Sequence, residues 1–449
     1  MAWIEDEAGR KNASSEIAAE AETAPDLTAA DVEVIPPEIF AQSLGEYLKA
    51  WSVRIRSGDA GVLPVAGALL AVSVVFFIIS PGHLFLTPRN LVFLFIQSSV
   101  FIVLAMAEGF VLLLGEIDLS TGYVAAIGGI VAALFVQPKM DLPWPLAIAL
   151  GLLACAGIGA LQGVIITRLR LPAFIVTLAG YLAWFGVMII IIGKDGVVGI
   201  TASRYNQEAL FGIVGNNIDP LIGWIGLVAI VGLLGLTMWR RDAGRRRRGL
   251  VAPPAGLTLA KIGFVAAAGV VVVAICNVNR GKFLPVEGVP WVVPLVLGVL
   301  ALWTLLLERT QFGRHMYAVG GNAEAARRAG INVPRVRTIG FILCSLTAGV
   351  AGVIYASQLG GMTTNVNGGQ LVLYAVAAAV IGGTSLFGGR GRAVHGLLGG
   401  LVIGAIYNGM YLMGYPIEVQ LVATGLVLLA AVTVDSLSRG AGSGSLARA

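Results

Sequence analysis

Acidic residues inside an apolar stretch are the first features of this sequence that suggest chemistry. Glu116 and Asp118 lie between Gly115 and Gly122 and interrupt a run that is otherwise apolar. Acidic side chains in such a run are costly to bury and usually face a protein interior or a cavity. The pattern predicts an unwound segment in which Asp118 or Ser120 caps the next helix. Two roles stay open for this segment: a gate that lines a pathway, or a cap that holds a tight turn.

A second interruption lies at residues 382–392, where five of eleven residues are glycine. Each glycine in a helix interior costs about 1 kcal/mol relative to alanine, so this segment is not a plain helix. It predicts a half-length helix that ends in a turn, with Arg390 and Arg392 at the level of lipid headgroups. The glycines expected to break the helix or to move as a gate are Gly382, Gly383, Gly388 and Gly389.

A short, capped surface helix is expected within residues 322–330. Asn322 is a good N-cap, and Glu324 follows in the first turn, where it suits the helix dipole. Arg327 and Arg328 come in the last turn, and Gly330 fits the position after the helix. A helix this short is unstable alone in water. It is therefore either a helix within a loop or an element that docks onto another molecule.

No metal site and no catalytic group of residues is indicated. The cysteine number is odd, no C-x-x-C pair occurs, and the histidines lie far apart in the sequence. The residues concerned are Cys155, Cys276, Cys344, His83, His315 and His395. The sequence therefore predicts neither an enzyme nor a chain that binds its own cofactor.

The elements that must position these residues follow from composition. Of 449 residues, 57% are hydrophobic and 12% are charged, whereas soluble domains carry about 25% charged residues. Such a chain cannot cover the surface of a cytosolic enzyme, a nucleic-acid binder or a secreted scaffold. The composition predicts an all-α, polytopic membrane protein that includes broken or half helices.

Membrane-crossing helices need about 20 apolar residues, and twelve runs qualify. If the pair at 219–239 and 257–277 failed to cross, ten would remain. The runs are 60–80, 91–114, 119–137, 144–167, 172–193, 219–239, 257–277, 290–307, 337–357, 371–387, 395–413 and 417–436.

Orientation follows from the basic residues, because Lys and Arg favour cytoplasmic loops. With both termini inside, nineteen basic residues after residue 59 fall on the cytoplasmic side and six outside. The run Arg245–Arg248 is expected to touch anionic membrane lipid. Residues 1–59, with a net charge of −7, predict a cytoplasmic, largely disordered tail with a surface helix near Ile39–Ile55. Residues 60–437 form the transmembrane domain, and 438–449 form a second cytoplasmic tail.

A faint internal repeat links two apolar segments. Ile158–Gly163 resembles Ile403–Gly409, and each segment is followed by a proline before the next run. In the predicted topology, the two segments cross the membrane in opposite directions. This arrangement suits an inverted repeat, a common plan for transporters.

Several motifs together resemble a known family. Glu324-Ala325-Ala326 followed by Gly330 matches the E-A-A-x-x-x-G pattern in permease subunits of bacterial ATP-binding-cassette importers. The surrounding segment resembles the branched family of sugar permeases for ribose, galactose and xylose. Further matches are Ile117–Gly122, Pro172–Leu178 and Ile381–Gly391. The resemblance runs from about residue 89 to 437, and the longer middle of the chain looks like the xylose permease.

The resemblance implies a division of labour. A homodimer of permease subunits would lie in the bacterial inner membrane, with a periplasmic sugar-binding protein delivering the substrate. Separate ATPase subunits would dock on the helix at Asn322–Gly330 and would hold the ATP. The chain itself has no G-x-x-x-x-G-K-[ST] segment and so no phosphate-binding loop. The residues implied in coupling are Asn322, Glu324, Ala325, Ala326, Arg327 and Gly330.

A sugar pathway needs hydrogen-bonding groups and aromatic faces without strong fixed binding. Each candidate is also compatible with a hydrogen bond between helices or a place in a loop. The candidates are Gln97, Ser98, Glu108, Asn365, Gln370, Tyr374 and Asn408. The alternative function is an ion- or proton-coupled secondary transporter, in which the acidic residues Glu108, Glu116, Asp118 and Glu418 would relay protons. The sequence does not name the sugar.

Overall fold

The computed structural model describes residues 63–201, 203–249, 252–282 and 284–426, together with residues 45, 429 and 433. Apart from Gly45, the tails expected at 1–59 and 438–449, and the surface helix expected near Ile39–Ile55, lie outside the described residues. The chain divides into two compact units. One contains Met238–Ala260 together with Met1–Val53, and the other contains Arg54–Thr237 and Lys261–Ala449.

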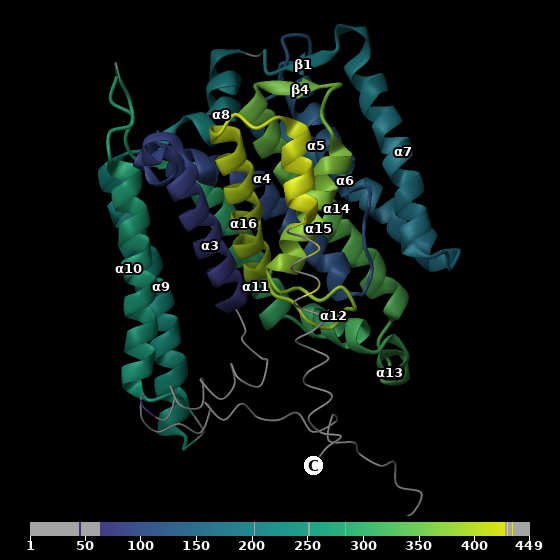
Figure 1. Cartoon of the computed structure of the whole chain (residues 1–449). Coiled ribbons are helices and arrows are strands. Elements are labelled where there is room, and N and C mark those ends of the chain that lie inside the picture. The colour runs from purple at the N-terminus through teal and green to yellow at the C-terminus, as the bar shows by residue number, and fades with distance from the viewer. Residues whose placement is uncertain are drawn as a thin grey trace, which may run out of the picture. The chain divides into compact units, whose positions relative to one another are not determined.

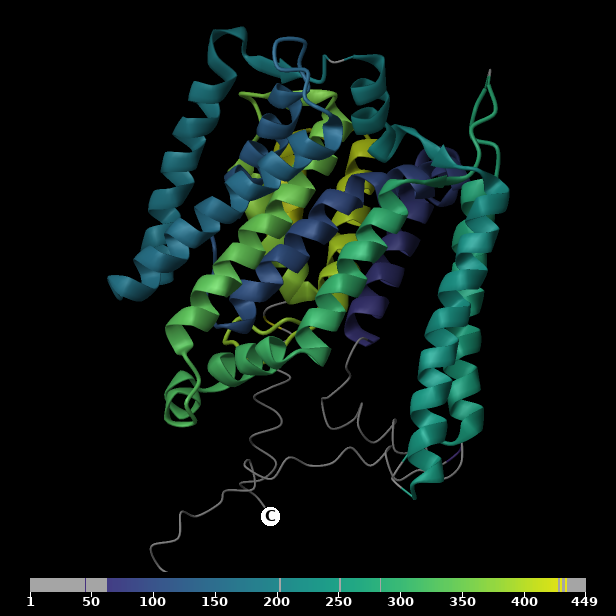
Figure 2. The same cartoon turned by 180° about the vertical axis from the view of Figure 1, so that it is seen from behind.

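The described elements are almost all helical (Figures 1 and 2). In chain order they are α3 (Leu63–Ile79), η2 (Pro81–Leu86), α4 (Pro88–Leu113), α5 (Thr121–Phe135), α6 (Trp144–Arg168), α7 (Ala173–Ile192), η3 (Gly193–Asp195), β1 (Val197–Gly199), α8 (Arg204–Gly215), β2 (Asn217–Ile218), α9 (Pro220–Arg247), α10 (Ala255–Asn277), β3 (Val289–Pro290), α11 (Val292–Arg309), α12 (Gln311–Gly321), α13 (Ala323–Arg328), α14 (Val333–Leu359), β4 (Gly361–Thr363), α15 (Gly368–Ile381) and α16 (Ala393–Leu412). A further helix spans Ile417–Leu426.

Eight of the described helices are long and apolar enough to cross a membrane: α4, α6, α7, α9, α10, α11, α14 and α16. Four shorter apolar helices are α3, α5, α15 and Ile417–Leu426. Together they occupy the places of the twelve predicted runs, and the middle pair, α9 and α10, is among the long ones. The prediction of an all-α, polytopic membrane protein with some short helices is confirmed.

The core of the larger unit is built from two groups of three helices, α4–α5–α6 and α14–α15–α16, which we call the first and second repeats. The first helix of each repeat packs on the third helix of the other, α14 on α6 and α4 on α16. In addition, α14 packs on α5, and α4 packs on α15. α4 runs toward α12, whereas α14 runs away from it (Figure 1). The two repeats are therefore inverted relative to each other.

Matching glycines hold the two repeats together. Gly159 on α6 faces Ser345 on α14, and an added Cβ would lie 2.8 Å from the Ser345 Oγ. Gly404 on α16 faces Ser98 on α4, where an added Cβ would lie 1.8 Å from Oγ. Small residues allow such close helix contacts in membranes. The faint sequence repeat at Ile158–Gly163 and Ile403–Gly409 thus falls on equivalent helices.

The short helices α5 and α15 begin next to each other inside the bundle. A Cβ on Gly122 would lie only 1.9 Å from the Gly368 carbonyl oxygen, and one on Gly368 would meet the ring of Tyr123. Both glycines are buried. The first turns of the two helices therefore pack backbone against backbone, which larger side chains would prevent.

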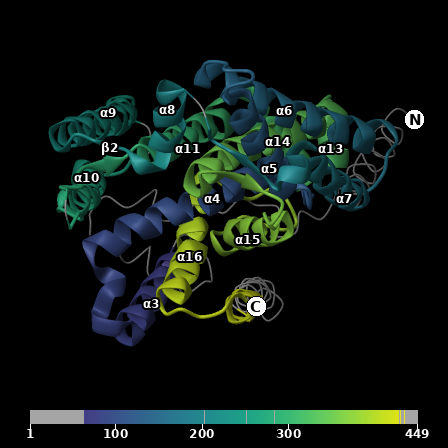
Figure 3. The same cartoon turned by 90° about the horizontal axis from the view of Figure 1, so that it is seen from above.

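Two small antiparallel ribbons complete the larger unit. β1 pairs with β4, with Val198 opposite Met362, and β2 pairs with β3, with Asn217 opposite Pro290. The β1–β4 ribbon lies at the end of the bundle away from α12 and α13 (Figure 1). It connects the segment after α7 to the turn before α15, because β4 leads directly into that turn. Figure 3 looks along the bundle, where α5 and α14 lie side by side.

Apart from Gly45, the described residues of the smaller unit are the end of α9, the beginning of α10 and part of the turn between them. The Thr258 hydroxyl donates to Asp242 Oδ2 at 2.9 Å, and Arg246 Nη1 donates to the Pro253 carbonyl at 2.6 Å. The Arg246 guanidinium also lies over the Trp239 ring, 5.4 Å from its centroid. Arg246, one member of the predicted lipid-contacting run, thus takes part in closing this turn.

Candidate functional site

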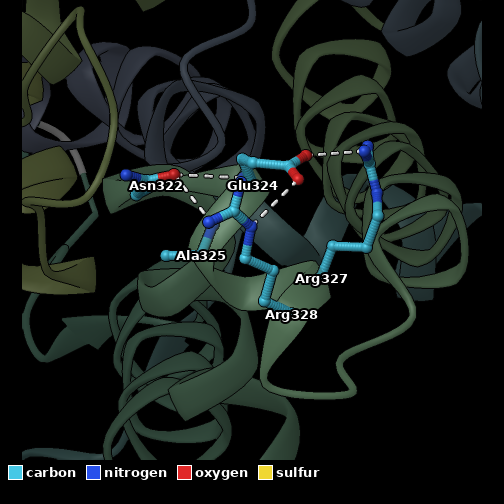
Figure 4. A network of polar contacts seen from close by, with 5 residues as sticks. All are labelled: Asn322, Glu324, Ala325, Arg327 and Arg328. Carbon is cyan, nitrogen blue, oxygen red and sulfur yellow. Dashed lines mark hydrogen bonds and ion pairs between the residues drawn. The ribbon is translucent and has the colours of Figure 1, made fainter.

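The helix α13 forms where the sequence predicts a short capped helix. Asn322 Oδ1 accepts hydrogen bonds from the backbone N–H groups of Glu324 and Ala325, at 3.1 and 2.9 Å (Figure 4). Gly330 follows with a φ of 84°, the left-handed conformation that favours glycine. The local sequence therefore fixes both ends of this helix.

The outer face of α13 is charged. Glu324 bonds to Arg327 at 2.7 Å and to Arg328 at 3.4 Å (Figure 4), and all three side chains are more than half exposed. Exposed pairs of this kind contribute only a few tenths of a kcal/mol each. Ala326 is buried and faces inward. The helix thus rests on a small apolar contact and presents a polar face outward.

The end of α12 contacts both glycine-containing breaks. A Cβ on Gly320 would lie 1.7 Å from the Leu113 carbonyl oxygen and 2.8 Å from the Gly389 nitrogen. The Gly389 N–H in turn donates to the same Leu113 carbonyl at 2.9 Å. Leu113 ends α4 at the first break, and Gly389 belongs to the second. The two breaks, far apart in sequence, therefore meet where α12 leads into α13.

Tyr317 adds a side-chain contact at this junction. Its hydroxyl donates to the Gly391 carbonyl at 2.7 Å. Burial, followed by the Glu308 carboxylate, raises the pKa of Tyr317, and Arg392 opposes the shift. The hydroxyl therefore stays protonated and able to donate at neutral pH. Arg392 Nε also lies 3.7 Å from Glu308 Oε1, which connects the second break to the end of α11.

The first break holds a buried polar network. Asp118 Oδ1 accepts hydrogen bonds from the Ser120 backbone N–H at 2.9 Å and from the Ser120 hydroxyl at 2.6 Å. Gln162 Nε2 on α6 donates to Ser120 Oγ at 2.8 Å. Ser120 occupies the N-cap position of α5, but its side chain makes no capping hydrogen bond. Of the two predicted caps, Asp118 holds the turn, and Ser120 links that turn to α6.

Glu108 lies against the start of α5 and is fully buried. Thr121 Oγ1 is 2.5 Å from Glu108 Oε1 and 2.8 Å from the Asp118 carbonyl oxygen. A hydroxyl has one hydrogen and a carbonyl only accepts. Both contacts are therefore hydrogen bonds only when Glu108 supplies the second hydrogen. Glu108 thus makes a hydrogen bond between helices, α4 and α5, one of the roles that the sequence leaves open for it.

Glu116 has a different environment. Its Oε1 lies 3.1 Å from Arg337 Nε on α14, and the Glu116 side chain is only 10% exposed. This ion pair joins the first break to the beginning of the second repeat. The acidic residues of the break thus separate into two structural roles, with Asp118 and Glu108 inside and Glu116 at the edge.

Of the predicted pathway residues, Gln97 and Asn408 come together. Asn408 Nδ2 donates to Gln97 Oε1 at 2.8 Å, and Asn90 Nδ2 donates to Asn408 Oδ1 at 2.9 Å. Gln358 on α14 adds a bond to the Ile96 carbonyl at 2.6 Å. Sequence reasoning missed Asn90 and Gln358, because both stand at the ends of apolar runs. An amide near a run end carries no signal that it reaches inward.

Gln370 and Tyr374 form a second group. Gln370 Nε2 donates to the Tyr374 hydroxyl at 2.7 Å. The Tyr374 ring lies edge-on to Phe101, with 5.3 Å between centroids, and Tyr407 also lies edge-on to Phe101 at 5.4 Å. These side chains come from α4, α15 and α16. Aromatic rings and the Gln370 amide thus come together between α4 of the first repeat and α15 and α16 of the second.

The remaining pathway candidates lie apart from both groups. Ser98 is buried and donates to the Leu94 carbonyl of its own helix at 2.6 Å. Asn365 is exposed in the turn after β4. Among the residues described, no group of three or more His, Cys, Asp and Glu side chains is arranged to hold a metal ion.

An inverted repeat of apolar helices, two broken connections and a capped polar helix at one end define a multi-pass membrane permease. The chain belongs to the family described as branched-chain amino acid transport system, permease component, whose sequence pattern matches residues 90–432. The predicted membership of this permease group is confirmed, and the chain is a multi-pass protein of the inner membrane.

Individual relatives carry more specific names. The chain is 34% identical to the xylose transport system permease protein of Escherichia coli K12, over 86% of this chain and 94% of the relative. It is 33% identical to the protein of that name from Haemophilus influenzae, over 82% and 95%. It is 32% identical to the ribose import permease protein of Escherichia coli K12, over 87% and 96%. No solved structure matches the chain.

Proposed function

We propose that this chain is the permease subunit of an ATP-binding-cassette importer that moves a monosaccharide from periplasm to cytoplasm. The observation that carries the proposal is the capped helix α13, whose outward face is polar and whose base contacts both breaks. The relatives named for xylose and ribose support a sugar as the substrate. Xylose is favoured, because the chain is 34% identical to the xylose permease and 32% identical to the ribose permease.

The ATPase subunit would dock on α13 in this proposal, with α12 carrying its motion inward. A displacement of α13 would move the end of α12, where Gly320 packs against Leu113 and Gly389. Because backbone atoms meet there without intervening side chains, a shift of α12 displaces both breaks together. The chain would hold no cofactor itself, and ATP would act through the partner subunit.

Other parts of the proposal follow from this orientation. α13 and both termini would face the cytoplasm, in agreement with the excess of basic residues on that side. A periplasmic binding protein would dock at the end that carries the β1–β4 ribbon. Two copies of the chain would form the permease dimer, with membrane lipid around them.

The ion-coupled alternative finds less support. Its proton relay would use Glu108 and Asp118, but a hydrogen bond between Glu108 and Thr121 and two from Ser120 to Asp118 hold these side chains in place. Glu116 is paired with Arg337 instead of continuing a chain toward them. The family description also names a component of a transport system, which suits a subunit that works with partners.

The test is sugar uptake into proteoliposomes that contain the chain with its ATPase and binding protein. We expect Glu324→Ala to lower ATP-driven uptake at least tenfold and to weaken co-purification of the ATPase. The control is Glu208→Ala on α8, which removes another exposed ion pair, with Arg204 at 2.7 Å, at the other end of the bundle, and should leave co-purification of the ATPase unchanged. Equal loss of ATPase co-purification in the two variants, or uptake driven by a proton gradient without the ATPase, would contradict the proposal.

A further inference from the structure

A hollow opens between the end of α6 and the beginning of α14. The two helices are in close contact at Gly163, where an added Cβ would lie 2.8 Å from Thr338 Cα. Beyond this contact a space of about 600 Å³ separates them. We call it the arginine groove. Its lining residues are Val164, Thr167, Arg168, Arg170, Asn332, Pro334, Arg335, Thr338 and Ile339.

The groove is strongly basic. Three of its nine lining residues are arginines, Arg168, Arg170 and Arg335, and none is acidic. Within the described ranges, no acidic side chain forms an ion pair with any of these three. Thr167 Oγ1 and Thr338 Oγ1 lie 3.2 Å apart, and both donate to the Gly163 carbonyl, at 2.7 and 3.3 Å. The three guanidinium groups therefore supply the donors of the groove, and guanidinium groups bind phosphate esters.

The neighbouring surface is apolar. Leu169, Leu171, Phe174 and Ile175 are exposed on the turn from α6 into α7, with Leu169 66% exposed. Figures 1 and 2 both show this turn at the outer edge of the bundle, where a surrounding membrane would reach it. An occupant therefore needs an anionic head for the arginines and an apolar tail for this surface.

The equivalent place in the second repeat is filled by protein. There the end of α16 meets the beginning of α4, and Gly409 packs on the ring of Phe76 from α3, where an added Cβ would lie 2.4 Å from the ring. Phe85 of η2 stacks on Phe76 with 5.4 Å between centroids. In the first repeat, the arginine groove has no such aromatic plug among its lining residues. The inverted repeat thus leaves one of two equivalent places open.

We propose that the arginine groove binds an anionic phospholipid of the surrounding membrane. Its phosphate lies among Arg168, Arg170 and Arg335, and its acyl chains follow the apolar surface at Leu169 and Phe174. This site is distinct from the run Arg245–Arg248, and it does not depend on which solute the permease carries.

The experiment measures lipid binding to the purified full-length chain by native mass spectrometry. Phosphatidylglycerol and phosphatidylcholine are titrated separately. Replacing all three groove arginines by glutamine should weaken phosphatidylglycerol binding at one site about 100-fold, since each basic residue near the surface contributes several-fold. The control replaces Arg240, Arg241 and Arg245 by glutamine, which removes the same charge elsewhere, and should leave that site intact.

Two further variants guard against misfolding. Lysine at all three positions keeps the charge and should retain most of the affinity, and Arg170→Gln alone should weaken binding about fivefold. The proposal is overturned if groove and control variants bind phosphatidylglycerol equally, or if phosphatidylcholine binds as well. It is also overturned if millimolar inorganic phosphate displaces the lipid. Loss of ATPase binding with unchanged lipid affinity would instead identify the groove as a protein-docking surface.

Discussion

The two repeats share a scaffold but differ in what their connections contain. α4 and α14 have nearly equal lengths, α5 and α15 are both short, and a glycine of each third helix packs on a serine of the opposite first helix. Yet the connection from α4 to α5 holds a buried acidic network, whereas that from α14 to α15 holds a strand and a turn with the exposed Asn365. The repeat determines where helices cross, and the connections determine what each half can do.

This difference separates residues that hold the bundle from residues that act. Gly159 and Gly404 have equivalent neighbours, so they serve the common scaffold. Glu108 and Asp118 have no acidic equivalents in the second repeat, because residues 333–412 contain neither Asp nor Glu. Residues that depart from the repeat are therefore the better candidates for function.

Disrupting the shared scaffold should have the largest effect. Gly404→Val should lower the free energy of unfolding by about 3 kcal/mol, because its side chain would overlap Ser98 and overpacked cores lose about this much. Gly159→Val should cost a similar amount, because its Cβ would lie 2.5 Å from the Phe341 carbonyl oxygen, a backbone atom that cannot rotate away. Thermal unfolding of the purified protein measures both. The control is Gly157→Val on α6, because Gly157 has open space around it. Equal losses of stability at all three positions would contradict the idea that the contacts of Gly159 and Gly404 stabilise the bundle.

The acidic network of the first repeat should give the next largest effect. Glu108→Ala leaves the Thr121 hydroxyl without its partner and opens a cavity, so we expect a loss of about 2 kcal/mol. Glu108→Gln keeps the shape and supplies a hydrogen, and should lose less than about 0.5 kcal/mol. Unfolding midpoints distinguish the two variants. A Gln variant as unstable as the Ala variant would mean that Glu108 must be ionised.

Asn408 is a polar residue that only the second repeat has, because its counterpart along the sequence repeat in the first is Gly163. Asn408→Ala removes the hydrogen bonds to Asn90 and Gln97. In membrane proteins such bonds are worth about 0.6 kcal/mol each, so we expect a loss of about 1 kcal/mol in unfolding experiments. The double variant with Gln97→Ala should lose little more, and full additivity would show that the two amides act separately.

Outside the repeats the effects should be smallest. Leu233 on α9 is 65% exposed, and its replacement by Ala should change the free energy of unfolding by less than about 0.5 kcal/mol. Leu112 on α4 is fully buried, and the same replacement there should cost about 2–5 kcal/mol. Unfolding curves of the two variants in detergent solution measure the difference. Similar losses would show that α9 belongs to the cooperative core.

The sequence predicts what is local and misses what joins distant segments. The caps of α13 and the break after Leu113 follow from residue types within one or two turns. The break is shorter than expected, because α5 begins at Thr121 and Gly122 lies in its first turn instead of in the break. The meeting of Leu113 with Gly389 could not be predicted, since helix packing brings them together and neither residue has a distinctive side chain. Likewise, Gln97 and Asn408 were separate candidates, and only the α4–α16 contact made them a pair.

The meeting of α5 and α15 at Gly122 and Gly368 has a consequence for ion leakage. Each helix beginning carries about half a positive charge, so two of them converge inside the bundle, and Asp118 lies close to only the first. Helix beginnings of this kind exclude cations and protons from pores. A passage past this point would admit a neutral, hydroxyl-rich solute while opposing the entry of a bare cation. The transport cycle would then leave the membrane potential intact.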